Sequence, residues 1–111
     1  PAKLASEITF QNKNKFDYVI ISDKIDAIEF AYPVFTKIIQ PEIITQDQYR
    51  FKKFDNVYIG NLSGEAVDGF IQNLPGPVLY IGDSGITNEI GKYKIVIGKD
   101  GVKALIIKRK N

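Results

Sequence analysis

An apolar run at residues 18–21 constrains the fold of this chain more than any other stretch. It reads Tyr-Val-Ile-Ile without alternation of apolar and polar residues, which is typical of a strand covered on both faces of a sheet. A segment with helical spacing of its apolar residues follows, and Pro41 separates it from a second β-branched run at 42–45. This order predicts a strand–helix–strand unit and therefore an α/β fold.

The same signals predict the other main elements. Strands are expected near 17–22, 42–45, 55–60 and 77–82. Main helices are expected near 24–39 and 63–74. Asp100-Gly101 lies between two β-rich runs, which predicts a C-terminal antiparallel hairpin from 92–97 and 102–108. We therefore expect a small, mostly parallel sheet with this hairpin added to it.

Three stretches give less regular patterns. Residues 1–15 alternate only weakly and turn polar, which predicts a flexible arm or a short edge strand. Thr45 and Gln48 match a capping box, so a short helix is expected over 46–53. Pro33 falls inside the helix expected at 24–39, where it predicts a kink or a break just before it.

Length and composition fit one domain over residues 1–111. Hydrophobic residues make up 44% of the chain and charged residues 25%, so a core can be buried without disulfides or a structural metal. No apolar stretch approaches the roughly 20 residues that a membrane helix needs. The N-terminal residues also lack the apolar centre of a signal peptide, and we therefore expect a cytoplasmic protein.

The absence of His and Cys excludes several classes of chemistry. It removes Ser-His-Asp and Cys-His nucleophiles, redox dithiols and the usual zinc ligands. No glycine-rich phosphate-binding motif is present either. We therefore predict no catalytic residue and no cofactor. Metal-assisted phosphate chemistry is the one enzymatic activity that remains as a hypothesis.

Polar loops follow three of the predicted strands. Ligands bind beyond the carboxyl ends of parallel strands, so these loops are the candidate ligand site. The candidate residues are Ser22, Asp23, Asn61, Ser63, Gly64, Asp83, Ser84 and Gly85. They suit a small anionic ligand, and Asp23 with Asp83 suits Mg²⁺ beside a phosphorylated one. Helix capping and turn formation explain the same residues, and we favour that interpretation.

The charge and the tyrosines bear on possible partners. A net charge of +2 argues against a dedicated nucleic-acid surface, although Lys52, Lys53 and the tail at 108–110 form local basic patches. An exposed strand edge and the tyrosines favour association with a second copy. We expect a small non-catalytic binding or interaction module that forms a homodimer or binds another protein. Anionic-ligand binding and weak nucleic-acid binding are the alternatives.

Overall fold

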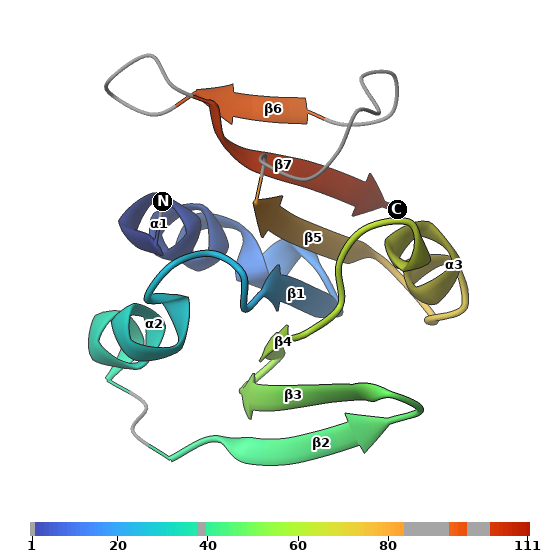
Figure 1. Cartoon of the computed structure of the whole chain (residues 1–111), viewed down its shortest axis with the longest axis horizontal. Helices are drawn as coiled ribbons and strands as arrows, with labels where there is room; N and C mark the ends of the chain where they lie inside the picture. Colours follow the sequence, from blue (N-terminus) through green and yellow to red (C-terminus); the bar gives the residue numbers. More distant parts are fainter. Residues whose placement is uncertain (1, 38–39, 84–93, 98–102) are drawn as a thin grey trace.

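The computed structural model describes residues 2–37, 40–83, 94–97 and 103–111, which form an α/β fold as expected (Figure 1). The helices are α1 (Ala2–Asn12), α2 (Ile28–Thr36) and α3 (Ala66–Gln72), with a 3-10 turn, η1 (Lys13–Lys15), after α1. The strands are β1 (Tyr18–Ser22), β2 (Glu42–Gln46), β3 (Tyr49–Phe54), β4 (Val57–Gly60), β5 (Val78–Asp83), β6 (Lys94–Ile97) and β7 (Lys103–Lys110). None of these helices is long and apolar enough to cross a membrane.

The strands form one mixed sheet in the order β2-β3-β4-β1-β5-β7-β6. Among the described strands, β1 pairs parallel with both β4 and β5, and the other pairs are antiparallel. The expectation of a mostly parallel sheet is therefore wrong. A two-residue turn joins β2 to β3, and so short a connection permits only antiparallel pairing.

The helix expected over 46–53 is also wrong, because this stretch forms the end of β2, a turn and most of β3. Asp47 adopts a φ of 55° in the preceding turn, and Asp55 adopts 61° in the next, so two tight turns bound the strand. Phe51 packs on the α3 side of the sheet and Phe54 on the α1–α2 side. The strand expected from residue 55 consequently begins at Val57, after the second turn.

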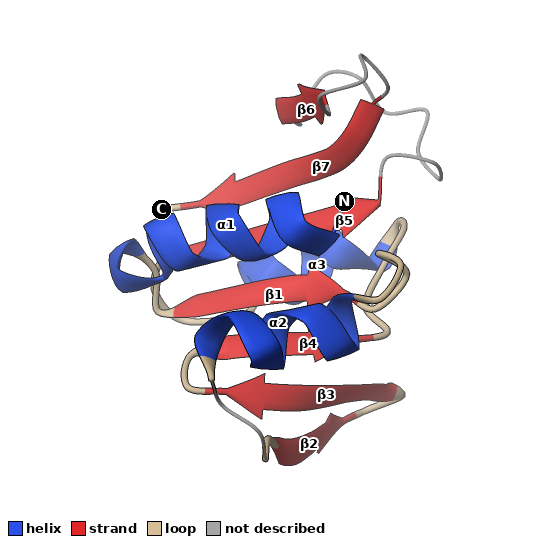
Figure 2. Ribbon diagram, turned by 90° about the vertical axis from the view of Figure 1, so that its left-hand side faces the viewer, coloured by secondary structure: helices blue, strands red, loops and turns tan. Residues whose placement is uncertain are grey.

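Strand β1 separates two apolar cores. Helices α1 and α2 cover one face of the sheet, and α3 lies on the other (Figure 2). Val19 and Ile21 of β1 pack on the α1–α2 side, with Tyr32 of α2 and Phe54 of β3. Ile20 packs on the α3 side. Coverage on both faces explains the unbroken apolar run from which β1 was predicted, and that strand is confirmed.

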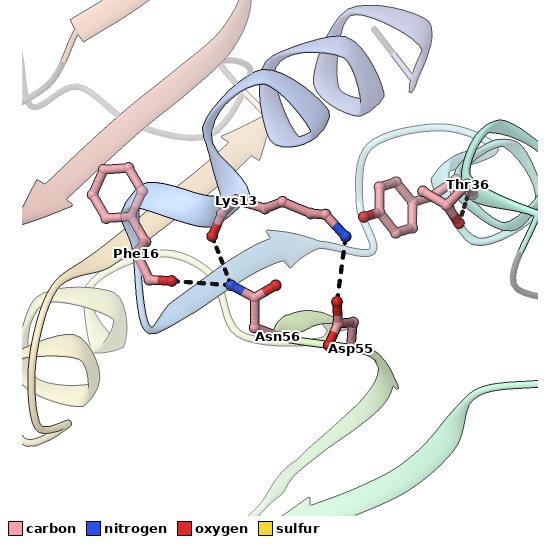
Figure 3. A network of polar contacts seen from close by, with 6 residues as sticks. Lys13, Phe16, Thr36, Asp55 and Asn56 are labelled. Atoms are coloured by element: carbon pink, nitrogen blue, oxygen red, sulfur yellow. Dashed lines mark hydrogen bonds and ion pairs between the residues drawn. The ribbon is translucent and has the colours of Figure 1, made fainter.

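The N-terminal stretch forms a helix, so the expectation of a flexible arm or edge strand is wrong. The side chains that α1 buries are small or polar, Ala5, Ser6 and Thr9, and they give little apolar periodicity. The amide of Asn56 anchors the end of this region by donating to the carbonyl oxygens of Lys13 at 2.8 Å and Phe16 at 3.0 Å (Figure 3). An ion pair of 3.3 Å from Lys13 to Asp55 joins η1 to the β3–β4 turn.

Helices α2 and α3 are shorter than expected, whereas the C-terminal hairpin is confirmed. Helix α2 begins after Ala27, which has a φ of 62°, and it runs through Pro33 without the expected break. Pro33 is the sixth of the nine residues of α2, where its ring nitrogen forgoes one backbone hydrogen bond while the helix continues to Thr36. Strands β6 and β7 pair antiparallel, and the predicted Asp-Gly turn between them lies outside the described residues.

Candidate functional site

The carboxyl ends of the parallel strands meet at one edge of the sheet. Ser22 at the end of β1 pairs in register with Gly60 at the end of β4, and Ile21 pairs with Ile81 of β5. The backbone N–H of Asp23 donates to the carbonyl oxygen of Gly60 at 2.8 Å, which ties the first two loops together. The three polar loops predicted from the sequence therefore begin side by side.

Tyr80 is the central side chain of this strand-end edge, and the sequence did not single it out. Its buried hydroxyl donates to the carbonyl oxygen of Leu62 at 2.8 Å and also interacts with Ser22. Gly82 makes room for its ring, because a Cβ there would lie 2.7 Å from Tyr80 Cε2. In a strand, residues two apart share a face, and this is the signal that could have linked Tyr80 to Gly82.

Burial dominates the ionisation of two tyrosines. Burial first, and the charges of Asp23 and Asp83 after it, raise the pKa of Tyr80 to about 12, against a hydrogen bond with Ser22 that lowers it. Burial first, and the charge of Asp55 second, raise the pKa of Tyr32 to about 12. Both hydroxyls therefore stay protonated in the folded protein at pH values where an unfolded chain would lose the protons.

We expect an alkaline loss of stability from these two groups. Because each folded pKa lies above the ordinary tyrosine value of 10, the stabilisation is fully present below pH 10 and is lost as the pH rises towards about 12. Near-ultraviolet absorbance should show a late phenolate component near pH 12, and Tyr80→Phe and Tyr32→Phe should each remove part of it. A folded protein whose tyrosines all ionise together near pH 10 would contradict this assignment.

Ser22 and Asp23 form a turn instead of the expected helix cap. The Ser22 hydroxyl is buried and accepts a hydrogen bond from the backbone N–H of Lys24 at 3.2 Å. Asp23 is exposed, yet partial desolvation and then the charge of Glu29 raise the pKa of its carboxyl above the ordinary value. Helix α2 starts several residues later, at Ile28, so neither side chain caps it.

The residues after β4 are placed differently from one another. Asn61 turns towards the β2–β3 hairpin, where its Oδ1 accepts from the Arg50 N–H at 2.8 Å and its Nδ2 donates to the Gln48 carbonyl oxygen at 3.3 Å. Ser63 does not cap α3, because that helix begins at Ala66. Gly64 has a φ of 72° and open space around it, so it serves the turn.

The strand-end edge carries negative charge. Asp83 ends β5, and with Asp23 it lies near enough to raise the pKa of Tyr80. Two carboxylates favour a cation over an anionic ligand. No group of three acidic side chains suited to a metal ion occurs within the described parts of the chain, and Ser84 and Gly85 lie outside them.

A second candidate site is an apolar patch on the outer side of the two N-terminal helices. We call it the α1–α2 patch, and it consists of Phe10, Phe30, Val34 and Phe35. Phe30 is 77% exposed and Val34 is 80% exposed, because Ile28 and Tyr32 turn the opposite side of α2 to the core. The rings of Phe10 and Phe35 meet edge to face at 5.5 Å, which joins α1 to α2 within the patch.

An aromatic groove of about 160 Å³ opens on the other face of the sheet, beside α3. Its lining residues are Tyr18, Ile20, Ile44, Gln46, Phe51, Tyr58, Phe70 and Leu74. The ammonium group of Lys53 lies 5.8 Å from the centre of the Tyr58 ring, at the side of this groove. Ile44 belongs to the terminal strand β2, so the lining of the groove extends to that edge of the sheet.

The basic residues named from the sequence are spread over both faces. Lys52 forms an ion pair with Glu29 on the α1–α2 side at 3.3 Å, whereas its neighbour Lys53 points to the aromatic groove. Lys108 is buried and forms an ion pair with Asp68 at 3.1 Å. These cations do not make one continuous basic surface.

Comparisons with protein-family models, with curated proteins and with solved structures found no significant match to this chain. The strand-end edge, the α1–α2 patch and the aromatic groove are the candidates that the described residues offer.

Proposed function

We propose that this protein is a non-catalytic interaction module that associates with a second copy of itself through the α1–α2 patch. The supporting observation is the clustering of large exposed apolar side chains on two adjacent helices. Phe30 and Val34 lie one helical turn apart, and the Phe10–Phe35 pair extends the same surface. Apolar and aromatic residues gathered in this way are characteristic of interface centres.

The patch has a rigid base, which suits a contact surface. Tyr32 lies on the opposite side of α2 from Phe30 and packs edge to face against Phe54 at 5.6 Å. The ion pair between Glu29 and Lys52 also holds α2 on the sheet. A surface that is already fixed loses little conformational entropy on binding. Two α2 helices related by a two-fold axis would bring their Phe30 and Val34 side chains together.

The strand-end edge gives less support to the alternative function, binding of a small anionic ligand. Its two carboxylates disfavour an anion, Asn61 is occupied by the β2–β3 hairpin, and Tyr80 is occupied by Leu62. Ser22, Asn61 and Tyr80 thus already have hydrogen-bond partners within the protein. Their arrangement therefore fits a role in joining the strands more than a role in holding a ligand.

The double change Phe30→Glu with Val34→Glu tests the proposed contact. Each substitution removes an apolar anchor and places like charges opposite each other across the interface, so we expect the Kd of association to rise about a hundredfold or more. Sedimentation velocity over a dilution series measures it. Both residues are highly exposed, so thermal unfolding should change little.

The matched control is Asn14→Glu with Ala66→Glu. It adds the same two negative charges at exposed positions outside the α1–α2 patch, and it should leave association unchanged. Equal Kd values for the patch variant and the wild type would rule out the patch as the contact. A wild type that sediments as a monomer at every concentration would rule out self-association itself.

A further inference from the structure

We infer that the free edge of β2 pairs antiparallel with β2 of a second copy, so that two sheets become one. The inference rests on the proposed self-association and adds a second contact to it, distinct from the α1–α2 patch. With two separate two-fold contacts, the chain would assemble beyond a dimer, into a closed tetramer or a longer array.

Strand β2 is an unprotected edge. It lies at one end of the order of strands (Figures 1 and 2). Its residues are exposed apart from Ile44, which is half-buried. Natural proteins guard such edges with Lys, Pro or a bulge, because the free backbone groups otherwise pair with another chain. Residues 42–46 contain neither Lys nor Pro, and their pairing with β3 has no register shift.

The opposite edge of the sheet differs in its regularity. The register of strand β6 with β7 shifts between Val96 and Ile97. An irregular ladder is one of the devices that discourage pairing with another chain. Of the two edges that the described strands form, β2 is therefore the one suited to pairing.

The hydrogen bond from Arg50 to Asn61 shows which backbone groups of β2 face outwards. The N–H of Arg50 donates to Asn61 Oδ1 at 2.8 Å, on the β4 side, so it points away from β2. Thr45 is the β2 partner of Arg50. In such a non-hydrogen-bonded antiparallel pair, both residues turn their N–H and C=O groups away from each other. The backbone N–H and C=O groups of Thr45 therefore point outwards from the sheet. Those of Ile43, two residues away, do the same.

A two-fold axis at Ile44, the central residue of β2, would pair every residue of this strand with one of the second copy. It places Ile43 opposite Thr45 of the second copy, where the outward backbone groups exchange hydrogen bonds, and Glu42 opposite Gln46 of the second copy. No like charges face each other in this register. The strand is therefore complementary to itself, which is why we assign the edge to a second copy and not to an unrelated peptide.

Side chains on both faces support this register. The two Ile44 side chains would meet at the axis, in a pair whose Cβ atoms lie about 4.5–5.5 Å apart. Because Ile44 lines the aromatic groove, this contact would join the apolar linings of two grooves. On the other face, Ile43 is 45% exposed and would be covered by Thr45 of the second copy.

Thr45→Pro tests the edge directly. The Thr45 N–H points outwards, so proline removes no hydrogen bond within the sheet, while it takes away half of the donors at the junction and obstructs the second strand. We expect the fold to persist and the assembly to fall to the dimer held by the α1–α2 patch. Thr45→Ala is the control and should assemble as the wild type does.

Combining Thr45→Pro with the double change at Phe30 and Val34 separates the two contacts. The combined variant should be a monomer, and the patch variant alone should be a dimer held by β2. If Thr45→Pro keeps the wild-type mass while the patch variant loses mass, the edge inference is overturned and the proposed function stands. If only Thr45→Pro loses mass, the edge contact stands and the patch does not.

A charge-pairing experiment provides a second test of the register. Ile44→Lys and Ile44→Glu each place two like charges at the axis, so each variant alone should lose the β2 contact. A mixture of the two places opposite charges there and should recover it, with a mass greater than that of either variant alone. A mixture that associates no more than its components would contradict pairing centred on Ile44.

Discussion

Phe54→Ala is expected to lower the free energy of unfolding by about 3–5 kcal/mol. The Phe54 side chain is only 1% exposed, and its ring packs edge to face against Tyr32 at 5.6 Å. Its removal would leave a cavity between β3 and α2, and the surrounding strands cannot collapse fully to fill it. Because α2 carries most of the α1–α2 patch, loosening α2 should weaken association as well.

Urea denaturation followed by circular dichroism measures the effect of Phe54→Ala. Phe10→Ala is the matched control, because it deletes the same ring from a side chain that is 57% exposed. That control should cost much less stability while it still weakens association through the α1–α2 patch. A loss below about 1 kcal/mol for Phe54→Ala would show that Phe54 does not anchor α2.

Gly60→Ala is expected to destabilise the fold by about 1–3 kcal/mol. A Cβ at Gly60 would lie 2.3 Å from the Arg50 carbonyl oxygen and 2.5 Å from Cδ1 of Phe51. The oxygen belongs to the backbone of β3, so relief of this clash requires a shift between β3 and β4. The structure therefore gives Gly60 a packing role within the sheet.

Gly69→Ala is the matched control for this change. Gly69 lies inside α3, and nothing occurs within 4 Å of the position that its Cβ would take. The same substitution should therefore stabilise the protein there, by roughly 0.5–1 kcal/mol, since alanine favours a helix. Thermal unfolding of the two variants should move in opposite directions. A shift in the same direction for both would mean that helix propensity, or the clash at Gly60, has been misjudged.

The sequence predicted those elements that carry an unbroken apolar run or a clear apolar periodicity. Strands β1 and β5, the C-terminal hairpin and the existence of α2 and α3 follow from apolar runs and helical spacing. Helix α1 was missed because it buries Ala5, Ser6 and Thr9, which leave almost no apolar stripe. Strand β3 was missed because Thr45 and Gln48 match a capping box, although Thr45 lies in β2 and Gln48 in the turn before β3.

The sequence located the strand-end edge but not its chemistry. The convergence of loops after β1, β4 and β5 follows from parallel pairing alone. The use of Asn61 by a hairpin that was itself not predicted could not be foreseen. Similarly, nothing in the sequence distinguishes Tyr80 from other strand residues. Its hydrogen bond to the carbonyl oxygen of Leu62 arises only in the folded chain. Exposure of Phe30 and Val34 depends on which side of α2 meets the sheet, which helical spacing alone leaves ambiguous.

Sedimentation equilibrium of the wild-type chain tests the central claim most directly. The chain has a mass of 12.5 kDa, and self-association through the α1–α2 patch and the β2 edge should give species heavier than a dimer at about 100 µM. Dilution should shift these species reversibly towards smaller ones. A constant mass of 12.5 kDa throughout the dilution series would contradict the account.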